Sequence, residues 1–252
     1  MQAIGAILFG GAIGLAAAGL AVQFGLRLAD RMPGESLLPE CFYCLRPAAA
    51  HEMIPVFGWL LRTHAMRLPC PCGQKLRQWP VPAAEIAGLL GGMAAGALGG
   101  FDAGMIWLYL VCGLLPAIAV VDLLFGIIPD IFNIALALLG AAWLLTGGGA
   151  ITVGLMLAGI LLLLGLFLSH GYSAIRRKEM LGLGDVKFFA AAGLWLQPDM
   201  LPWFLVMAGV LGAIFALVWR RIGGGEQAPF APALCLSLFF CILARLWGVG
   251  QW

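Results

Sequence analysis

The sequence predicts an all-α fold: a polytopic membrane protein with about eight transmembrane helices and a cytoplasmic loop domain that contains Cys pairs. Of its 252 residues, 63% are hydrophobic and only 10% are charged, whereas an average soluble domain has about 25% charged residues. Apolar runs of about 20 residues recur along the chain, and each can cross a hydrocarbon core of roughly 30 Å as a helix. We therefore expect the lipid bilayer to surround most of the chain. The net charge of +2 is too small to indicate a nucleic-acid partner, and we exclude that class.

The chain divides into three parts. Residues 1–26 have no Lys or Arg, so we expect a first transmembrane helix over 3–26 and not a secretory signal, which begins with basic residues. Residues 27–79 are polar and contain six prolines, which predicts a compact loop domain. Residues 80–252 form a core of seven helices. These helices are expected at about 82–100, 103–121, 128–146, 150–169, 186–198, 201–219 and 229–248.

The distribution of basic residues predicts the orientation of these helices. Seven of the fourteen Lys and Arg residues lie in 27–79, four lie in 176–187, and Arg220 and Arg221 lie between the last two helices. With eight helices, these three segments fall on one side of the membrane, which the positive-inside rule assigns to the cytoplasm. Both termini then lie on the opposite side.

Two isolated acids are predicted at the cytoplasmic ends of two of these helices. Asp122 follows the apolar run 103–121, and Asp185 precedes the run 186–198. Two carboxylates close together in a partly desolvated site share a proton, so that one is an acid while the other accepts a proton from water. This arrangement predicts hydrolysis by general acid and base catalysis without a covalent intermediate. The alternative is structural, with Asp185 as a solvated helix cap in a Gly-containing loop.

Other polar positions near these acids have structural interpretations. Gly182 and Gly184 leave space beside Asp185 for a substrate backbone or a second helix. Asp130 follows Ile128-Pro129, and we expect it to cap the start of the next helix. Glu85 is an acid in an apolar stretch, where orienting its neighbours is its expected role. Three further cysteines in apolar helices are expected to be packing residues: Cys112, Cys235 and Cys241.

Taken together, these motifs resemble the two aspartate motifs of the type IV prepilin peptidases, which are polytopic membrane aspartyl proteases of the GxGD type. The first motif is Asp122 followed by Ile128-Pro129-Asp130. The second is Glu179-Met180 leading into Gly182-Leu183-Gly184-Asp185, with Lys187 two positions later. The resemblance covers nearly the whole chain, because the Cys pairs, Ile54-Pro55-Val56 and Pro82-Ala83-Ala84-Glu85 also match in outline.

The resemblance implies an endopeptidase in the bacterial inner membrane, with its site at the cytoplasmic face. Its substrates would be precursors of type IV pilins or of type II secretion pseudopilins, cut after a glycine to remove a short leader. Asp122 and Asp185 would be the catalytic residues. The supporting residues would be Gly182, Gly184, Lys187, Asp130 and Glu179.

The loop domain contains two Cys pairs on the side assigned to the reducing cytoplasm. They are Cys41 with Cys44, and Cys70 with Cys72. Four thiolates at such spacing suit a structural zinc ion. The resembling family uses two CxxC pairs, whereas the second pair here is CxC. Free thiols, or a mixed site that includes His64, are the alternatives.

Bifunctional members of this family also methylate the new N-terminus with S-adenosylmethionine. They usually carry a Gly-Ser-Phe-Leu-Asn run at the end of the first helix and an Asn before the Ile-Pro of the loop. The corresponding stretches here read Val22-Gln23-Phe24-Gly25-Leu26 and His51-Glu52-Met53. We therefore expect cleavage without methylation, and S-adenosylmethionine as a cofactor is left open.

Two other classes are consistent with the same composition. The first is a non-proteolytic membrane protein, either a transporter or a degenerate scaffold of a pilus or secretion system. Transporters often contain two related halves with broken helices, and no convincing repeat is visible in this sequence. The second is a protease that cuts inside transmembrane helices, as presenilin-like GxGD proteins do.

Overall fold

The computed structural model describes residues 2–29, 80–100, 102–176, 182–222 and 228–248. These parts of the chain are all-helical, as the composition predicts. Their elements are α1 Gln2–Ala29, α3 Pro80–Gly99, α4 Met105–Phe125, α5 Asp130–Trp143, the π-helical turn η2 Leu144–Gly148, α6 Ile151–Arg176, α7 Leu183–Gly193, α8 Leu201–Arg221 and α9 Ala231–Leu246.

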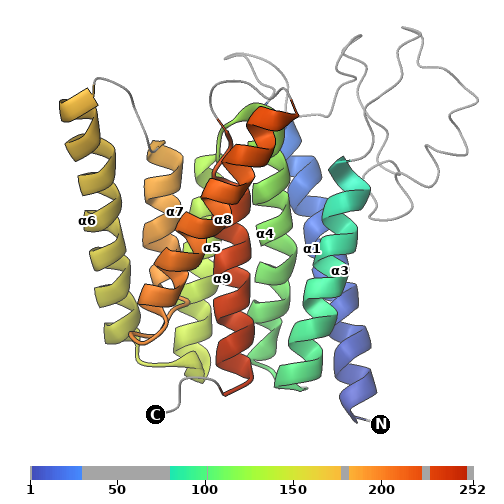
Figure 1. Cartoon of the computed structure of the whole chain (residues 1–252). Coiled ribbons are helices and arrows are strands. Elements are labelled where there is room, and N and C mark those ends of the chain that lie inside the picture. The colour runs from blue at the N-terminus through green and yellow to red at the C-terminus, as the bar shows by residue number, and fades with distance from the viewer. Residues whose placement is uncertain (1, 30–79, 101, 177–181, 223–227, 249–252) are drawn as a thin grey trace, which may run out of the picture.

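The helices run up and down through one bundle (Figure 1). Both chain termini lie at one end of the bundle. The helix ends that flank residues 30–79, 177–181 and 223–227 lie at the other end (Figure 1). The helix ends that lead into the three basic segments therefore share one end of the molecule, as predicted. We call it the loop end, and we call the opposite end the terminal end.

Among the described helices, six are long and apolar enough to cross a membrane: α1, α3, α4, α5 with η2, α6 and α8. Helix α9 is apolar but has only 16 residues, and α7 has 11. At 1.5 Å per residue, α7 is about 16 Å long, roughly half of a hydrocarbon core. The chain is thus a multi-pass membrane protein.

The boundaries of α7 differ from the prediction of 186–198. The helix begins three residues earlier, at Leu183, and it ends at Gly193. Gly193 packs against α6 so closely that a Cβ there would lie 2.4 Å from the Ala158 backbone nitrogen. Two short-range bonds, from Leu194 to Ala191 and from Trp195 to Ala192, then terminate the helix. Asp185 consequently lies inside the first turn of α7.

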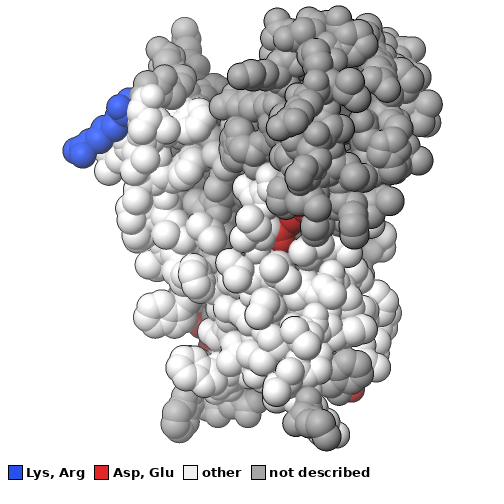
Figure 2. Space-filling view, turned by 90° about the vertical axis from the view of Figure 1, so that its right-hand side faces the viewer, with Lys and Arg blue, Asp and Glu red and all other residues white. Residues whose placement is uncertain are grey.

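Helix α4 forms the centre of the bundle, in contact with α1, α3, α5 and α9. In its most apolar window 67% of the residues are buried, compared with 22% in α6 and 11% in α8. The outer helices expose large apolar side chains, among them Leu163, Phe167, Trp203 and Leu217. Figure 2 shows the side of the bundle formed by α1 and α3, where the described surface between the two ends is almost entirely uncharged. Such a surface is suited to lipid.

Helices α1 and α3 pack through glycines that leave no room for side chains. A Cβ on Gly10 would lie 2.4 Å from the Gly92 carbonyl oxygen, and a Cβ on Gly88 would lie 2.4 Å from the Gly14 carbonyl oxygen. Small residues at four-residue spacing allow membrane helices to approach closely. This contact fixes the first helix against the core.

Arg245 joins three helices at the terminal end. Its Nη1 donates to the Trp195 carbonyl at 2.9 Å, and its Nη2 donates to the Gly148 carbonyl. The guanidinium also lies 5.8 Å from the centre of the Trp143 ring. The last carbonyls of a helix have no partner within the helix, and a cation can bind them. This explains why Arg245 lies at the terminal end, where the described residues include no other Lys or Arg.

Candidate active site

Asp122 lies in the last turn of α4, near the loop end. The helix ends at Gly126, whose φ of +67° is left-handed and whose N–H donates to the Asp122 carbonyl at 2.8 Å. Glycine adopts this conformation without the steric cost that other residues incur. The position of Asp122 along the bundle is therefore set by a defined helix end. Its side chain is 5% exposed.

The carboxylate of Asp122 binds the start of α9. Its Oδ2 accepts a hydrogen bond from the Ala231 N–H at 2.9 Å, and the Phe230 amide also hydrogen-bonds this carboxylate. The first N–H groups of a helix have no partner within the helix, and they attract negative charge. Asp122 thus caps α9 from a neighbouring helix.

Asp185 lies in the first turn of α7, where it is partly buried. The amide of Gly182 hydrogen-bonds its carboxylate. Asp185 and Asp122 lie near enough for their charges to interact. The fold therefore brings together the two acids that the sequence singled out, one from the end of α4 and one from the start of α7.

The two glycines of the GxGD motif have different surroundings. A Cβ on Gly184 would lie 3.3 Å from the Ile128 Cβ and 3.5 Å from its carbonyl oxygen, so this glycine allows α7 to approach the segment before α5. A Cβ on Gly182 would meet only Asp185 Oδ2, at 3.4 Å. Gly184 therefore serves close packing, and Gly182 leaves open space beside the acid.

Asp130 is paired with Lys187 and is not a helix cap. The N-cap of α5 is Pro129, and no side chain forms a cap hydrogen bond there. Asp130 is the first helical residue, and its Oδ1 lies 2.6 Å from Lys187 Nζ. The expected position in the first turn of α5 is confirmed, but the expected cap hydrogen bond is absent, because the side chain reaches across to α7. The pair links the start of α5 to the start of α7, with Lys187 49% and Asp130 64% exposed.

Two residues near the acids were not identified from the sequence as part of a site. Cys235 is buried one turn into α9, and its thiol interacts electrostatically with both Asp122 and Asp185. Asn133 is buried one turn into α5 and hydrogen-bonds the Gly184 carbonyl. The only sequence signal for Asn133 is a polar residue three positions after Asp130 in an otherwise apolar helix. Cys235 has no such signal.

Several predicted residues lie outside the described parts of the chain. They are Glu179 and the four loop cysteines, Cys41, Cys44, Cys70 and Cys72. Within the described ranges, no group of three or more His, Cys, Asp or Glu residues could hold a metal ion. The zinc site therefore stays a prediction. Glu85, on α3, is buried with 2% exposure.

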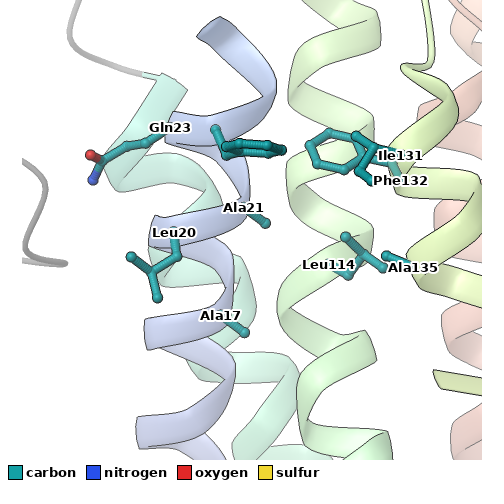
Figure 3. Close-up of a pocket in the computed structure, with 9 residues that line it drawn as sticks. Ala17, Leu20, Ala21, Gln23, Leu114, Ile131, Phe132 and Ala135 are labelled. Atoms are coloured by element: carbon teal, nitrogen blue, oxygen red, sulfur yellow. The ribbon is translucent and has the colours of Figure 1, made fainter. Parts of the chain in front are cut away.

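An apolar groove of about 470 Å³ lies between α1, α4 and α5, apart from the two acids (Figure 3). Its lining residues are Ala17, Leu20, Ala21, Gln23, Phe24, Leu114, Ile131, Phe132 and Ala135. Gln23 is the only polar one among them, and its amide points away from the apolar side chains (Figure 3). The groove provides no group for acid or base chemistry.

Known proteins are similar to the part of the chain that contains the two acids. The model of the type IV leader peptidase family matches residues 108–217, a range that contains both aspartates. A prepilin leader peptidase/N-methyltransferase of Pectobacterium carotovorum subsp. carotovorum is 31% identical over 211 residues, which are 80% of this chain and 72% of the relative. A protein of the same name from Burkholderia pseudomallei is 32% identical over 219 residues, 81% of this chain and 67% of the relative.

A third relative carries a different name. The type 4 prepilin-like proteins leader peptide-processing enzyme of an enterotoxigenic Escherichia coli strain is 30% identical over 203 residues, 79% of this chain and 72% of the relative. No solved structure matches the chain.

Proposed function

Because this chain belongs to the type IV leader peptidase family and is a prepilin leader peptidase, we propose that Asp122 and Asp185 are its two catalytic acids. The observation that carries this proposal is their juxtaposition. Two acids from distant helices lie at the same end of the bundle, close enough to interact, in a protein with few charges. A buried or partly buried acid in a membrane helix is costly, and such residues usually have a function.

The proposed reaction needs only the two carboxyl groups and a water molecule. One carboxylate takes a proton from the water, whose oxygen attacks the scissile carbonyl carbon. The protonated carboxyl group donates its proton to the carbonyl oxygen, which gives a neutral tetrahedral diol. The acid that took the water proton then gives it to the departing nitrogen, while the other carboxylate takes a proton from one hydroxyl group of the diol. The C–N bond breaks, the new carboxyl group forms, and the dyad again holds one proton. The products are a leader with a new carboxyl terminus and a pilin with a new amine.

The surrounding chain holds the two acids in place for this reaction. The Ala231 and Phe230 amides orient the Asp122 carboxylate, and the Gly182 amide orients that of Asp185. Such fixed hydrogen bonds reduce the reorganisation needed in the transition state. We assign Gly182, Gly184, Lys187, Asp130 and Glu179 supporting roles. Those of Gly184, Lys187 and Asp130 are to dock α7 against the start of α5.

The substrates follow from the family, which acts on type IV prepilins. We extend the proposal to pseudopilins of type II secretion. We also place the loop end in the cytoplasm and the protein in the bacterial inner membrane, because the helix ends that lead into the three basic segments lie at that end. We do not propose a transporter or a degenerate scaffold as the function, because the relatives of this chain are named as processing enzymes.

Zinc in the loop domain is a separate proposal, and S-adenosylmethionine as a cofactor is left open. We propose that Cys41, Cys44, Cys70 and Cys72 hold one structural zinc, for which their spacing is the support. Elemental analysis of protein purified without chelators should then give close to one zinc per chain, and Cys41→Ser should abolish it. Zinc-free protein would leave the thiols as a metal-free cluster. We derive no step of the cleavage from either group.

The activity and its site can be tested together with purified protein in detergent. We would incubate it with a panel of precursors of type IV pilins and pseudopilins and determine the new N-termini by mass spectrometry. One new terminus per cleaved precursor, placed just after a leader glycine, is expected. Cuts within the apolar part of the precursors would instead indicate a protease that acts inside membrane helices.

A further inference from the structure

Asn133 is a buried polar residue that the two aspartate motifs do not include. It lies one turn into α5 and is 4% exposed. Its Nδ2 donates to the Gly184 carbonyl oxygen at 3.2 Å. A carbonyl oxygen only accepts hydrogen bonds, so the nitrogen of the amide must be the atom that faces Gly184. The contact therefore has a defined direction from α5 to α7.

The carbonyl that Asn133 binds belongs to the peptide group between Gly184 and Asp185. This peptide group is planar, so a hydrogen bond to its oxygen also restrains the nitrogen and Cα of Asp185. The Cα restrained in this way carries the Asp185 carboxyl group. The absence of a side chain at Gly184 gives Ile128 and Asn133 access to this peptide from α5 and the segment before it.

The oxygen atom of the Asn133 amide indicates that this residue contributes little to the stability of the fold. Its Oδ1 is buried and has no hydrogen-bond partner among the described residues. Leaving a buried acceptor without a partner costs at least as much free energy as a single hydrogen bond contributes. An apolar side chain of similar size should therefore be tolerated at least as well by the fold. A residue that costs stability in this way is typical of a functional position.

We propose that Asn133 is a positioning residue that orients Asp185 through the Gly184 carbonyl. The proposal rests on the catalytic role proposed above for Asp185. Asn133 does not contact the reacting atoms. The Lys187–Asp130 pair and the packing of Ile128 on Gly184 set how near α7 lies to α5, and the Asn133 hydrogen bond sets how the Asp185 peptide is turned.

Two variants of the full-length protein test this role. Asn133→Leu removes both ends of the amide. Asn133→Asp keeps the shape and the Oδ1 acceptor but replaces the Nδ2 donor with a carboxylate oxygen. Both should lower kcat about 10- to 100-fold, because small displacements of a catalytic group have effects of this size. KM should stay within about twofold, because the hydrogen bond does not touch the substrate. The thermal unfolding midpoint of Asn133→Leu should equal or exceed that of the parent protein.

Ser237→Ala is the matched control. Ser237 is also a buried polar residue, but its Oγ donates to the Ala233 carbonyl at 2.7 Å within its own helix, α9. Its loss removes a buried hydrogen bond without touching α7. Ser237→Ala should therefore retain the parental kcat.

The outcomes separate this inference from the proposed dyad. A kcat within twofold of the parent for both Asn133 variants would overturn the positioning role, as would a raised KM at unchanged kcat. A large loss of stability in Asn133→Leu would show that the residue is structural, and this also overturns the inference. Asp185→Asn is measured in parallel. If it is active, the dyad itself fails, whereas an inactive Asp185→Asn beside a fully active Asn133→Leu refutes the positioning role alone.

Discussion

Asp122 of α4 and Ala231 of α9 are joined by a 2.9 Å hydrogen bond between Oδ2 and the backbone nitrogen, across 109 positions of the chain. The acid is thus held by the start of another helix, whose free N–H groups require an acceptor. This contact gives Asp122 a structural role besides its proposed chemical one. Substitutions at Asp122 must therefore be chosen so that the two roles are separated.

Stability should distinguish two substitutions at Asp122. In Asp122→Asn the amide oxygen can still accept from the Ala231 N–H, so the unfolding midpoint should change little. In Asp122→Ala no acceptor remains, and the free energy of unfolding should fall by about 1–2 kcal/mol. Thermal unfolding of both variants in the same detergent measures the difference. Equal stability of the two would show that the cap on α9 contributes nothing.

The two glycines of the GxGD motif should differ in their tolerance of Ala. A Cβ at Gly184 would lie 3.3 Å from the Ile128 Cβ, so α7 or the Ile128 segment must shift. Gly182 is exposed and has a φ of −65°, which any residue can adopt. We expect a several-fold loss of kcat in Gly184→Ala and a smaller loss in Gly182→Ala. The reverse order in a cleavage assay would mean that space beside Asp185 matters more than helix docking.

The Lys187–Asp130 ion pair should matter little for stability. Both side chains are about half exposed or more, and exposed ion pairs contribute about 0–1 kcal/mol. We expect Lys187→Gln and Asp130→Asn to lower the unfolding free energy by less than about 1 kcal/mol. The double exchange Lys187→Asp with Asp130→Lys should restore most of any lost activity. If the exchange restores nothing while both variants are folded, then the individual residues, and not their pairing, are required.

The helices and the two acids could be predicted from local features of the sequence. Apolar runs determine which segments become helices, and the basic residues determine which helix ends share one side. Asp122 directly follows one apolar run and Asp185 directly precedes another. The predicted orientation of these helices then places both acids at the same end. The prediction erred for Asp130, because its partner Lys187 lies 57 positions away and no pattern along the chain pairs them.

Contacts between distant helices account for the rest of the site. Asn133 bonds Gly184 because α5 and α7 pack together in the folded chain. Arg245 bonds Trp195 and Gly148 because the end of α9 meets η2 and the residues that follow α7. The close approach of α6 to Gly193, at the end of α7, is likewise a tertiary contact. Such pairings depend on helix packing and have no signature in composition, periodicity or spacing.

Methylation should be absent, because the segments associated with it lack several polar side chains. Gln23 is the only polar residue in 22–26, and its amide points away from the apolar groove between α1, α4 and α5 (Figure 3). Each lost polar contact to a cofactor weakens binding by about 1–3 kcal/mol. We expect the product formed in the presence of S-adenosylmethionine to have an unmodified terminus. A stoichiometric gain of one methyl group, about 14 Da by its chemical formula, would show that the chain is bifunctional, as its relatives are named.

The proposed dyad is tested most directly by the cleavage rates of Asp122→Asn, Asp185→Asn and the double variant, measured on one prepilin under single-turnover conditions. Residues that act as a unit are not additive. Each single variant should therefore be as inactive as the double variant, with a rate at least about 1,000-fold below the parent. Unfolding midpoints near that of the parent would exclude loss of folding as the cause. A folded single variant that keeps more than about 5% of the parental rate would contradict the assignment of that aspartate to the dyad.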